Sequence, residues 1–282
     1  MPKGRIMKIK ELINYGKNKL IENKIEDENI KTKVLLKYIL NVDDFYLVIH
    51  NDENQDKEIE TKFINCINEL IEGKPLQYIT RHQEFMNLDF YVDENVLIPQ
   101  PDTEVLVLQT INIIKQYESG NIKVLDLCTG SGAIAISTAK AFENQAVQVY
   151  ASDISDKALE VAKKNSKKND VHINFINSNM FENIDEKFDI IVSNPPYIET
   201  ETIKKLSKDV QQEPHIALDG GFDGLEFYKI IASEYEKYLN DNGTLLLEIG
   251  YNQKQSVTEL FINRNVECIK DLAQNDRVII VK

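Results

Sequence analysis

The second half of the chain alternates short apolar runs with amphipathic segments, and this alternation constrains the fold more than any other feature. The apolar runs are typical of buried strands, and the segments between them have helical periodicity. Strands separated by helices form a parallel, doubly wound α/β sheet. The strands are predicted at 122–128, 147–153, 173–179, 188–194 and 243–250, and the helices at 132–142, 156–169, 225–239 and 255–264.

Two flanking regions complete this α/β domain. The last apolar segments, 266–273 and 276–282, predict a terminal hairpin that adds antiparallel pairing at one edge of the sheet. Before the first strand, the segment 99–117 opens with prolines and continues as an amphipathic helix, for which Asp102 or Thr103 is the predicted cap.

The first 82 residues have a different pattern, with apolar residues at helical spacing between clusters of Asp and Asn. We expect a small helical bundle, whose last long helix ends at Gly73 and Pro75. Residues 83–98 alternate apolar and polar positions around Asn87 and again around 93–95, which predicts a hairpin or paired short strands. The predicted apolar faces of the bundle are Leu12, Ile13, Leu20 and Ile21; Val34, Leu35, Tyr38 and Ile39; and Phe63, Ile64, Ile67, Leu70 and Ile71.

The composition excludes several classes of protein. The net charge of -13 opposes a broad surface for nucleic acid, because phosphates would be repelled. Three cysteines and four histidines are scattered, so we expect neither a disulfide framework nor a metal site. The chain has no run of 18 apolar residues, and its start lacks an apolar core, so we expect a cytoplasmic protein that contacts no membrane.

A glycine-containing loop lies between the strand at 122–128 and the following helix. Gly130 and Gly132 let the backbone approach a ligand closely, and the helix N-terminus offers free N–H groups. Asp153 ends the next strand, where an acid can accept both hydrogen bonds from a ribose diol. The two features together predict a site for a nucleotide-like cofactor.

The loop lacks the full G-x-G-x-x-G pattern that holds a pyrophosphate. The segment DLCTGSG instead resembles motif I of S-adenosylmethionine methyltransferases. Their cofactor carries a sulfonium cation, which suits an acid such as Asp126; the alternative is that Asp126 merely caps the loop. Such enzymes often place an acid after the third strand for the adenine amino group. Here Asn179 would act through its carbonyl, or Met180 or Phe181 would line the adenine face.

The segment NPPY follows the strand at 188–194, at the sheet edge where doubly wound folds bind ligands. In isolation it could simply be a turn that ends the strand. It could also grip a planar NH2 group, since the Asn194 carbonyl and the Pro195 backbone carbonyl can accept its two N–H bonds. Pro195 and Pro196 would fix the carbonyl direction, and Tyr197 would stack on the planar group. Adenine, cytosine, guanine and glutamine all remain as acceptors.

Blocks along most of the chain narrow this choice: GKPLQYIT, EFMNLDFYVDENVLIPQPDTE, VLDLCTGSGAIAI, SNPPYI, EP at 213–214, ALDGGFDGLEFY, LLLEIG and DLAQNDRVIIV. In this order they resemble the PrmC/HemK family of protein-(glutamine-N5) methyltransferases. The resemblance implies methylation of the glutamine in the Gly-Gly-Gln loop of peptide-chain release factors. It also implies a helical domain at 1–82 that docks the release factor, a hairpin linker at 83–98 and a Rossmann-like class I methyltransferase domain with a seven-stranded sheet at 99–282.

Site residues follow from the same resemblance. The acceptor pocket falls at Asn194, Pro195, Pro196 and Tyr197, and Asn194 also faces the cofactor. The cofactor-binding residues are Asp126, Cys128, Thr129, Gly130, Ser131, Gly132, Asp153, Asn179 and Met180. The enzyme is expected to be a monomer that uses no metal and binds no nucleic acid directly.

Three positions depart from the family pattern. Cys128 stands where Gly is usual, and Asn179 stands where Asp is common. Gln100 replaces the Arg of the usual IPRP segment, which removes a positive charge near the site. The glycines at 220, 221 and 224 form either a surface turn or the entrance to the pocket.

Two rival functions remain. A DNA adenine-N6 methyltransferase also uses Asn-Pro-Pro-Tyr, but it would need a basic groove, which the excess of acidic residues opposes. A non-catalytic protein that binds S-adenosylmethionine would have no need of the NPPY pocket.

Overall fold

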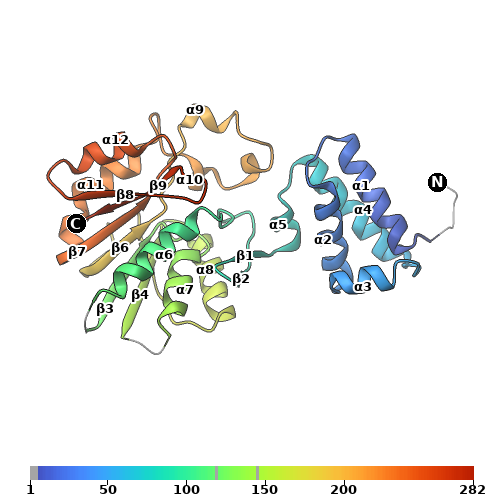
Figure 1. Ribbon diagram of the computed structural model, residues 1–282, viewed down its shortest axis with the longest axis horizontal. Coiled ribbons are helices and arrows are strands. Elements are labelled where there is room, and N and C mark those ends of the chain that lie inside the picture. Colours follow the sequence, from blue (N-terminus) through green and yellow to red (C-terminus); the bar gives the residue numbers. More distant parts are fainter. Residues whose placement is uncertain (1–5, 118–119, 144–145) are drawn as a thin grey trace. The chain divides into compact units, whose positions relative to one another are not determined.

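The computed structural model describes residues 6–117, 120–143 and 146–282, which form two compact units (Figure 1). The first unit contains the described residues up to Arg81 together with Lys208–Gln212. The second contains His82–Ser207 and Glu213–Lys282, so the hairpin segment belongs to it. No helix in the described ranges combines the length and the apolar character needed to cross a membrane.

The first unit is a helical bundle. Its helices are α1 (Ile9–Glu22), α2 (Glu28–Leu40), α3 (Asp44–Ile49), α4 (Lys57–Glu72) and α5 (Leu76–Thr80), and the 3-10 turn η1 (Val210–Gln212) belongs to the same unit. Helix α4 ends at Gly73, whose φ of 103° gives the left-handed C-cap that only glycine adopts easily. The fully buried core residues include Leu12, Leu20, Leu35, Leu36, Phe63 and Ile67.

Two predicted core positions of the bundle are wrong. Ile21 and Tyr38 are 55% and 43% exposed, because each lies at the margin of its helix's apolar face. The sequence pattern does not predict the short helix α3, since polar clusters enclose it on both sides. It starts at Asp43, whose carboxylate accepts a hydrogen bond from the Tyr46 backbone N–H (2.8 Å).

The second unit contains the predicted doubly wound sheet of seven strands, in the order β5-β4-β3-β6-β7-β9-β8. All pairs are parallel except those that β9 makes with β7 and β8, which confirms an antiparallel closing hairpin. The strands are β3 (Ile122–Leu127), β4 (Val147–Asp153), β5 (Asn174–Asn177), β6 (Phe188–Ser193), β7 (Leu239–Glu248), β8 (Val266–Lys270) and β9 (Asp276–Val281).

Helices cover both faces of this sheet (Figure 1). Neighbouring strand residues alternate between two apolar clusters: Val124 packs with α6 and α7, and Leu125 packs with α11. The helices are α6 (Thr103–Ile114), α7 (Ala133–Ala141), α8 (Asp156–Lys168), α9 (Thr200–Ile203), α10 (His215–Leu218), α11 (Glu226–Tyr238) and α12 (Lys254–Thr258), with the 3-10 turn η2 (Glu259–Phe261).

Some predicted boundaries need correction. Strand β7 begins at Leu239 rather than at 243, and the helix predicted at 255–264 is reduced to α12 and the turn η2. The hairpin β1 (Gln83–Phe85) and β2 (Leu88–Phe90) turns at Met86 and Asn87, as predicted. Among the described residues no second strand pair surrounds 93–95, where the Val96 N–H donates to the Asp93 carbonyl in a turn.

Strand order decides where a ligand site can form. After β3 the chain builds outward through β4 and β5, and it then returns to place β6 on the other side of β3. A crevice opens beyond the carboxyl ends of strands where the order reverses in this way. The glycine loop follows β3 and the NPPY segment follows β6, so this topology brings both motifs to one place.

Candidate active site

The loop between β3 and α7 is built from left-handed backbone. Cys128, Gly130 and Gly132 have φ values of 63°, 54° and 82°. Gly132 also packs closely, because a Cβ there would lie 2.9 Å from Ile136 Cδ1 and 3.1 Å from Ala162 Cβ. The left-handed backbone at Cys128 gives a physical reason why a glycine would suit that position.

Asp126 anchors this loop from below. Its Oδ2 accepts hydrogen bonds from the Thr129 hydroxyl (2.6 Å) and the Ala135 backbone N–H (3.1 Å). The side chain is fully buried, and burial raises its pKa to about 7. Within the described residues Oδ1 has no hydrogen-bond partner. The contacts make Asp126 a link between the loop and the start of α7.

Asp153, at the end of β4, is held beside the same loop. One carboxylate oxygen accepts from the Gly130 backbone N–H (2.8 Å), and the other accepts from the Ser155 backbone N–H (2.9 Å). Burial raises its pKa, and these backbone hydrogen bonds oppose the rise. Each oxygen keeps a lone pair, so the carboxylate can still accept hydrogen bonds from a ligand.

The side-chain amide of Asn165 also holds this loop, at Ser131. Asn165 is fully buried, and its Nδ2 donates to the carbonyls of Ser131 and Tyr91, both at 2.9 Å. Its Oδ1 accepts from the Tyr91 N–H at 2.7 Å. One side chain therefore joins the loop to the segment that follows the hairpin.

Both motifs border one cavity of about 360 Å³, a volume that lies within the range of small-molecule sites. Four predicted site residues do not line this cavity, namely Asp126, Gly132, Pro195 and Tyr197. The predicted residues that line the cavity are Cys128, Thr129, Gly130, Ser131, Asp153, Asn179, Met180, Asn194 and Pro196.

The residues after β5 border one end of the cavity. The Asn179 Nδ2 donates to Glu182 (2.8 Å), which leaves its carbonyl oxygen to accept from a ligand. Met180 lines the cavity with its sulfur 3.9 Å from the Cys128 Sγ. Phe181 does not reach the cavity, because it is buried and stacks on Tyr238 with ring centroids 4.7 Å apart.

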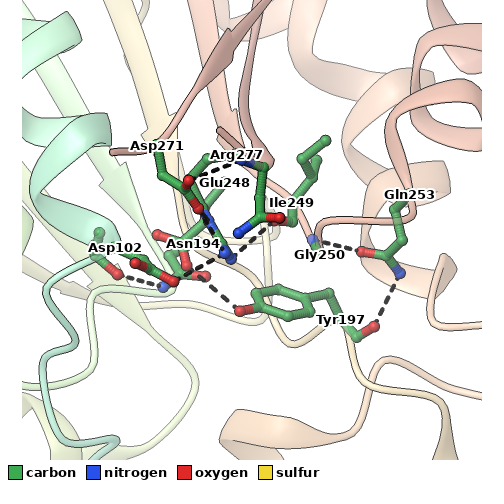
Figure 2. A network of polar contacts seen from close by, with 11 residues as sticks. Asp102, Asn194, Tyr197, Glu248, Ile249, Gly250, Gln253, Asp271 and Arg277 are labelled. Atoms are coloured by element: carbon green, nitrogen blue, oxygen red, sulfur yellow. Dashed lines mark hydrogen bonds and ion pairs between the residues drawn. The ribbon is translucent and has the colours of Figure 1, made fainter. Parts of the chain in front are cut away.

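Asn194 also lines the cavity, and it contacts a residue that the sequence does not assign to the site. Its Nδ2 donates to the Thr103 hydroxyl (3.3 Å). Glu248, at the carboxyl end of β7, accepts a hydrogen bond from the Tyr197 hydroxyl (3.5 Å; Figure 2). Glu248 is 2% exposed, and burial raises its pKa to about 7. The block LLLEIG contains this acid but gave no reason to select it.

A buried arginine joins the start of α6 to the closing hairpin (Figure 2). Arg277 is paired with Asp102 (2.8 Å) and Asp271 (3.1 Å), and it donates to the Ile249 carbonyl (3.4 Å). Asp102 is the N-cap residue of α6, as one of the two predictions has it, but its side chain makes no capping hydrogen bond. Its carboxylate is directed to the arginine instead. Gln100, which replaces the usual Arg, lines the cavity and donates to the Ile98 carbonyl (3.1 Å).

The NPPY segment rests on the glycine-rich loop that follows α10. The Ile198 N–H donates to the Leu218 carbonyl (3.0 Å), and the Gly220 N–H donates to the Ile198 carbonyl (2.8 Å). A Cβ at Gly220 would lie 2.7 Å from the Tyr197 Cα. The Tyr197 hydroxyl donates to the Glu248 carboxylate (3.5 Å), and Tyr197 does not line the cavity. This loop therefore packs against the NPPY segment and is not a free surface turn.

Comparisons with known proteins match both the N-terminal and the C-terminal part of this chain to methyltransferases. Residues 103–218 match the family model "Methyltransferase small domain", and residues 11–80 match "PrmC N-terminal domain". The release factor glutamine methyltransferase of Clostridium acetobutylicum is 39% identical, over 97% of this chain and 98% of its own. The enzyme of the same name from Lactococcus lactis is 44% identical, over 76% and 79%.

Other relatives are longer or more distant. A "Bifunctional methyltransferase" of Rickettsia felis is 37% identical over 96% of this chain, which spans 57% of that protein. Among solved structures, a methyltransferase from Pyrococcus furiosus aligns with a TM-score of 0.52 at 19% identity, over 80% of this chain and 98% of that one. This last likeness concerns the fold alone.

Proposed function

Because the chain belongs to the family of release factor glutamine methyltransferases, we propose that it transfers a methyl group from S-adenosylmethionine to a release-factor glutamine. The acceptor atom is the side-chain amide nitrogen (N5) of the glutamine in the Gly-Gly-Gln motif. One observation supports this most directly: Asp153 and Asn194, from different strands, border the same cavity. A cofactor and a planar amide can therefore meet there.

The residues at one end of the cavity fit the cofactor. S-adenosylmethionine supplies an electrophilic methyl carbon on its sulfonium. The left-handed loop Cys128–Gly132 brings backbone close to the ligand, and Asp153 accepts hydrogen bonds from the ribose diol. Asn179, through its carbonyl oxygen, and Met180 border the adenine. Asp126 acts indirectly, by holding the loop.

The residues at the other end hold the acceptor. The Asn194 Oδ1 would accept one N–H bond of the glutamine amide, and the Pro195 carbonyl, although Pro195 itself does not line the cavity, would accept the other. The two hydrogen bonds would direct the nitrogen toward the methyl carbon. An amide nitrogen is a poor nucleophile because its lone pair is delocalised, so positioning and electrostatics carry the catalysis. The nitrogen loses a proton after transfer, and no dedicated general base is required.

The remaining parts of the chain have supporting roles in this proposal. The bundle at 1–82 docks the release factor, residues 83–98 link it to the catalytic domain at 99–282, and the enzyme acts as a cytoplasmic monomer. The net charge of -13 disfavours nucleic acid as the substrate.

Labelled S-adenosylmethionine tests the substrate. The protein is incubated with it and either a release factor or duplex DNA, and label is expected in the release factor only. Label in DNA alone would establish the nucleic-acid rival, and label in neither would leave a binding protein. A release factor whose Gly-Gly-Gln glutamine is changed to alanine serves as the control and should stay unlabelled.

Asn194→Ala tests the acceptor pocket. The variant should lose methyl transfer, since nothing else would fix the amide, and it should keep an affinity for S-adenosylmethionine within about threefold of the unmodified enzyme. Calorimetric titration measures the affinity. If cofactor binding collapsed together with transfer, Asn194 would belong to the cofactor site instead.

A further inference from the structure

The direction of the Pro195 carbonyl matters for the acceptor pocket, and its importance rests on the function proposed above. Proline has a fixed φ angle, so few rotatable bonds separate this carbonyl from the Tyr197 backbone. A constraint on the Tyr197 backbone therefore limits the directions that the Pro195 carbonyl can take. We propose that the Gln253 side chain supplies this constraint and is a positioning residue for methyl transfer.

The Gln253 amide joins three backbone segments. Its Nε2 donates to the Tyr197 carbonyl (3.0 Å) and to the Gly224 carbonyl (3.1 Å), and its Oε1 accepts from the Gly250 N–H (2.9 Å). The contacts with Tyr197 and Gly250 are drawn in Figure 2. Gly224 belongs to the loop between α10 and α11, and Gly250 follows β7. One side chain therefore ties the NPPY segment to the glycine-rich loop and to the end of a central strand.

The orientation of this amide follows from its partners, which are all backbone groups. A backbone N–H only donates and a backbone carbonyl only accepts, so Oε1 has to face Gly250 and Nε2 has to face the two carbonyls. The NH2 group then uses one hydrogen on each carbonyl. The Gln253 N–H also donates to the Gly250 carbonyl (2.9 Å), so these two residues are joined in both directions.

Glycines flank the amide at both ends and let it approach the backbone closely. A Cβ at Gly224 would lie 2.8 Å from the Gln253 Nε2, and a Cβ at Gly250 would lie 2.9 Å from its Oε1. Gln253 does not line the cavity, whereas Asn194 and Pro196 of the NPPY segment do. Its effect on methyl transfer must therefore pass through Tyr197.

Two substitutions at Gln253 test its role. Gln253→Glu keeps the shape but replaces the donor NH2 with an oxygen, which would face two carbonyl oxygens. Gln253→Met keeps the length and removes both polar ends. Each variant should lower kcat for a release factor by about 10- to 100-fold, because the NPPY segment is no longer held. Each should keep an affinity for S-adenosylmethionine within about threefold of the unmodified enzyme by calorimetry, which also shows that the variant is folded.

Gln255→Met is the matched control. Gln255 lies in α12, two residues further on, and its Nε2 donates to the exposed Glu259 side chain (2.9 Å) instead of to the NPPY segment. This variant should keep a normal kcat.

Three results would overturn the role of Gln253. They are a normal kcat in either Gln253 variant, a collapse of cofactor affinity together with kcat, and an equal fall of kcat in Gln255→Met. The unmodified enzyme is assayed in parallel, and its failure to label a release factor would refute the proposed function rather than the role of Gln253.

Discussion

At the scale of single residues, two buried carboxylates carry the site without touching a substrate. Asp126 ties the loop after β3 to α7, and Glu248 accepts a hydrogen bond from the Tyr197 hydroxyl behind Asn194 in the NPPY segment. Each has one oxygen without a hydrogen-bond partner among the described residues. A buried charge that is only partly satisfied opposes folding, because burial favours the neutral form. Both residues therefore contribute function at some cost to stability.

Asp126→Asn tests that cost through pH. Burial raises the pKa of Asp126 from 3.8 to about 7, so the folded protein holds the proton more tightly than the unfolded chain. The stabilisation from this proton is complete below about pH 4 and disappears as the pH rises through about 7. The variant should therefore gain stability relative to the unmodified protein over this range, by at most about 4 kcal/mol. Urea unfolding at pH 5 and pH 8 measures it, and an equal difference at both values would contradict the assignment.

At the scale of elements, the NPPY segment depends on a loop that follows it by more than 20 residues. Gly220 lies against the backbone of Tyr197, and it also approaches the Pro196 carbonyl, 2.9 Å from where a Cβ would stand. Gly224 contacts the Tyr197 carbonyl from the other side. The NPPY segment can lie where it does because neither glycine has a side chain.

Gly220→Ala should therefore displace the NPPY segment. Gly220 does not have a left-handed backbone, so alanine can adopt its conformation, and the effect comes from the contact at 2.7 Å. We expect kcat to fall about 10-fold or more while the affinity for S-adenosylmethionine changes little.

Gly243→Ala is the control. Gly243 lies five residues before the carboxyl end of β7. A Cβ there would lie 2.6 Å from the Cγ of the Leu239 side chain. This variant should keep its kcat even if its melting temperature falls. Equal kcat values for the two variants would show that Gly220 has no special role.

The sequence predicted the elements better than the contacts between them. Strands such as β4 were predicted correctly because an apolar run between polar residues is a local signal. Thr103, Glu248 and Arg277 were not assigned to the site, because their meeting depends on how α6, β7 and β9 pack. Helices α9 and α10, with four residues each, are too short to show a helical period. Pairing of distant residues is what a single sequence does not display.

At the scale of the whole molecule, the two units have separate apolar cores. Leu36 belongs to the core of the bundle, and Leu125 belongs to one of the two cores around the sheet. All residues that line the cavity come from the second unit. Cofactor binding should therefore depend on the second core alone, whereas methyl transfer to a protein should depend on both.

Leu36→Ala tests this separation. The side chain is fully buried, and its truncation should destabilise the bundle by about 2–5 kcal/mol. Calorimetry should show an earlier transition for the first unit and unchanged binding of S-adenosylmethionine. Leu125→Ala, at an equally buried position in the second unit, is the matched comparison and should weaken cofactor binding. Loss of binding in Leu36→Ala would mean that the units do not fold independently.

The buried amide of Asn165 has a mechanical consequence. Its side chain makes three hydrogen bonds to the backbone at two places far apart in the sequence, Tyr91 and Ser131. A displacement of the chain at Tyr91, just after the hairpin, would therefore be transmitted through Asn165 to the loop at Ser131 without passing through the sheet. Movement of the segment at Tyr91 and ligand binding in the cavity, which Ser131 lines, should consequently affect each other.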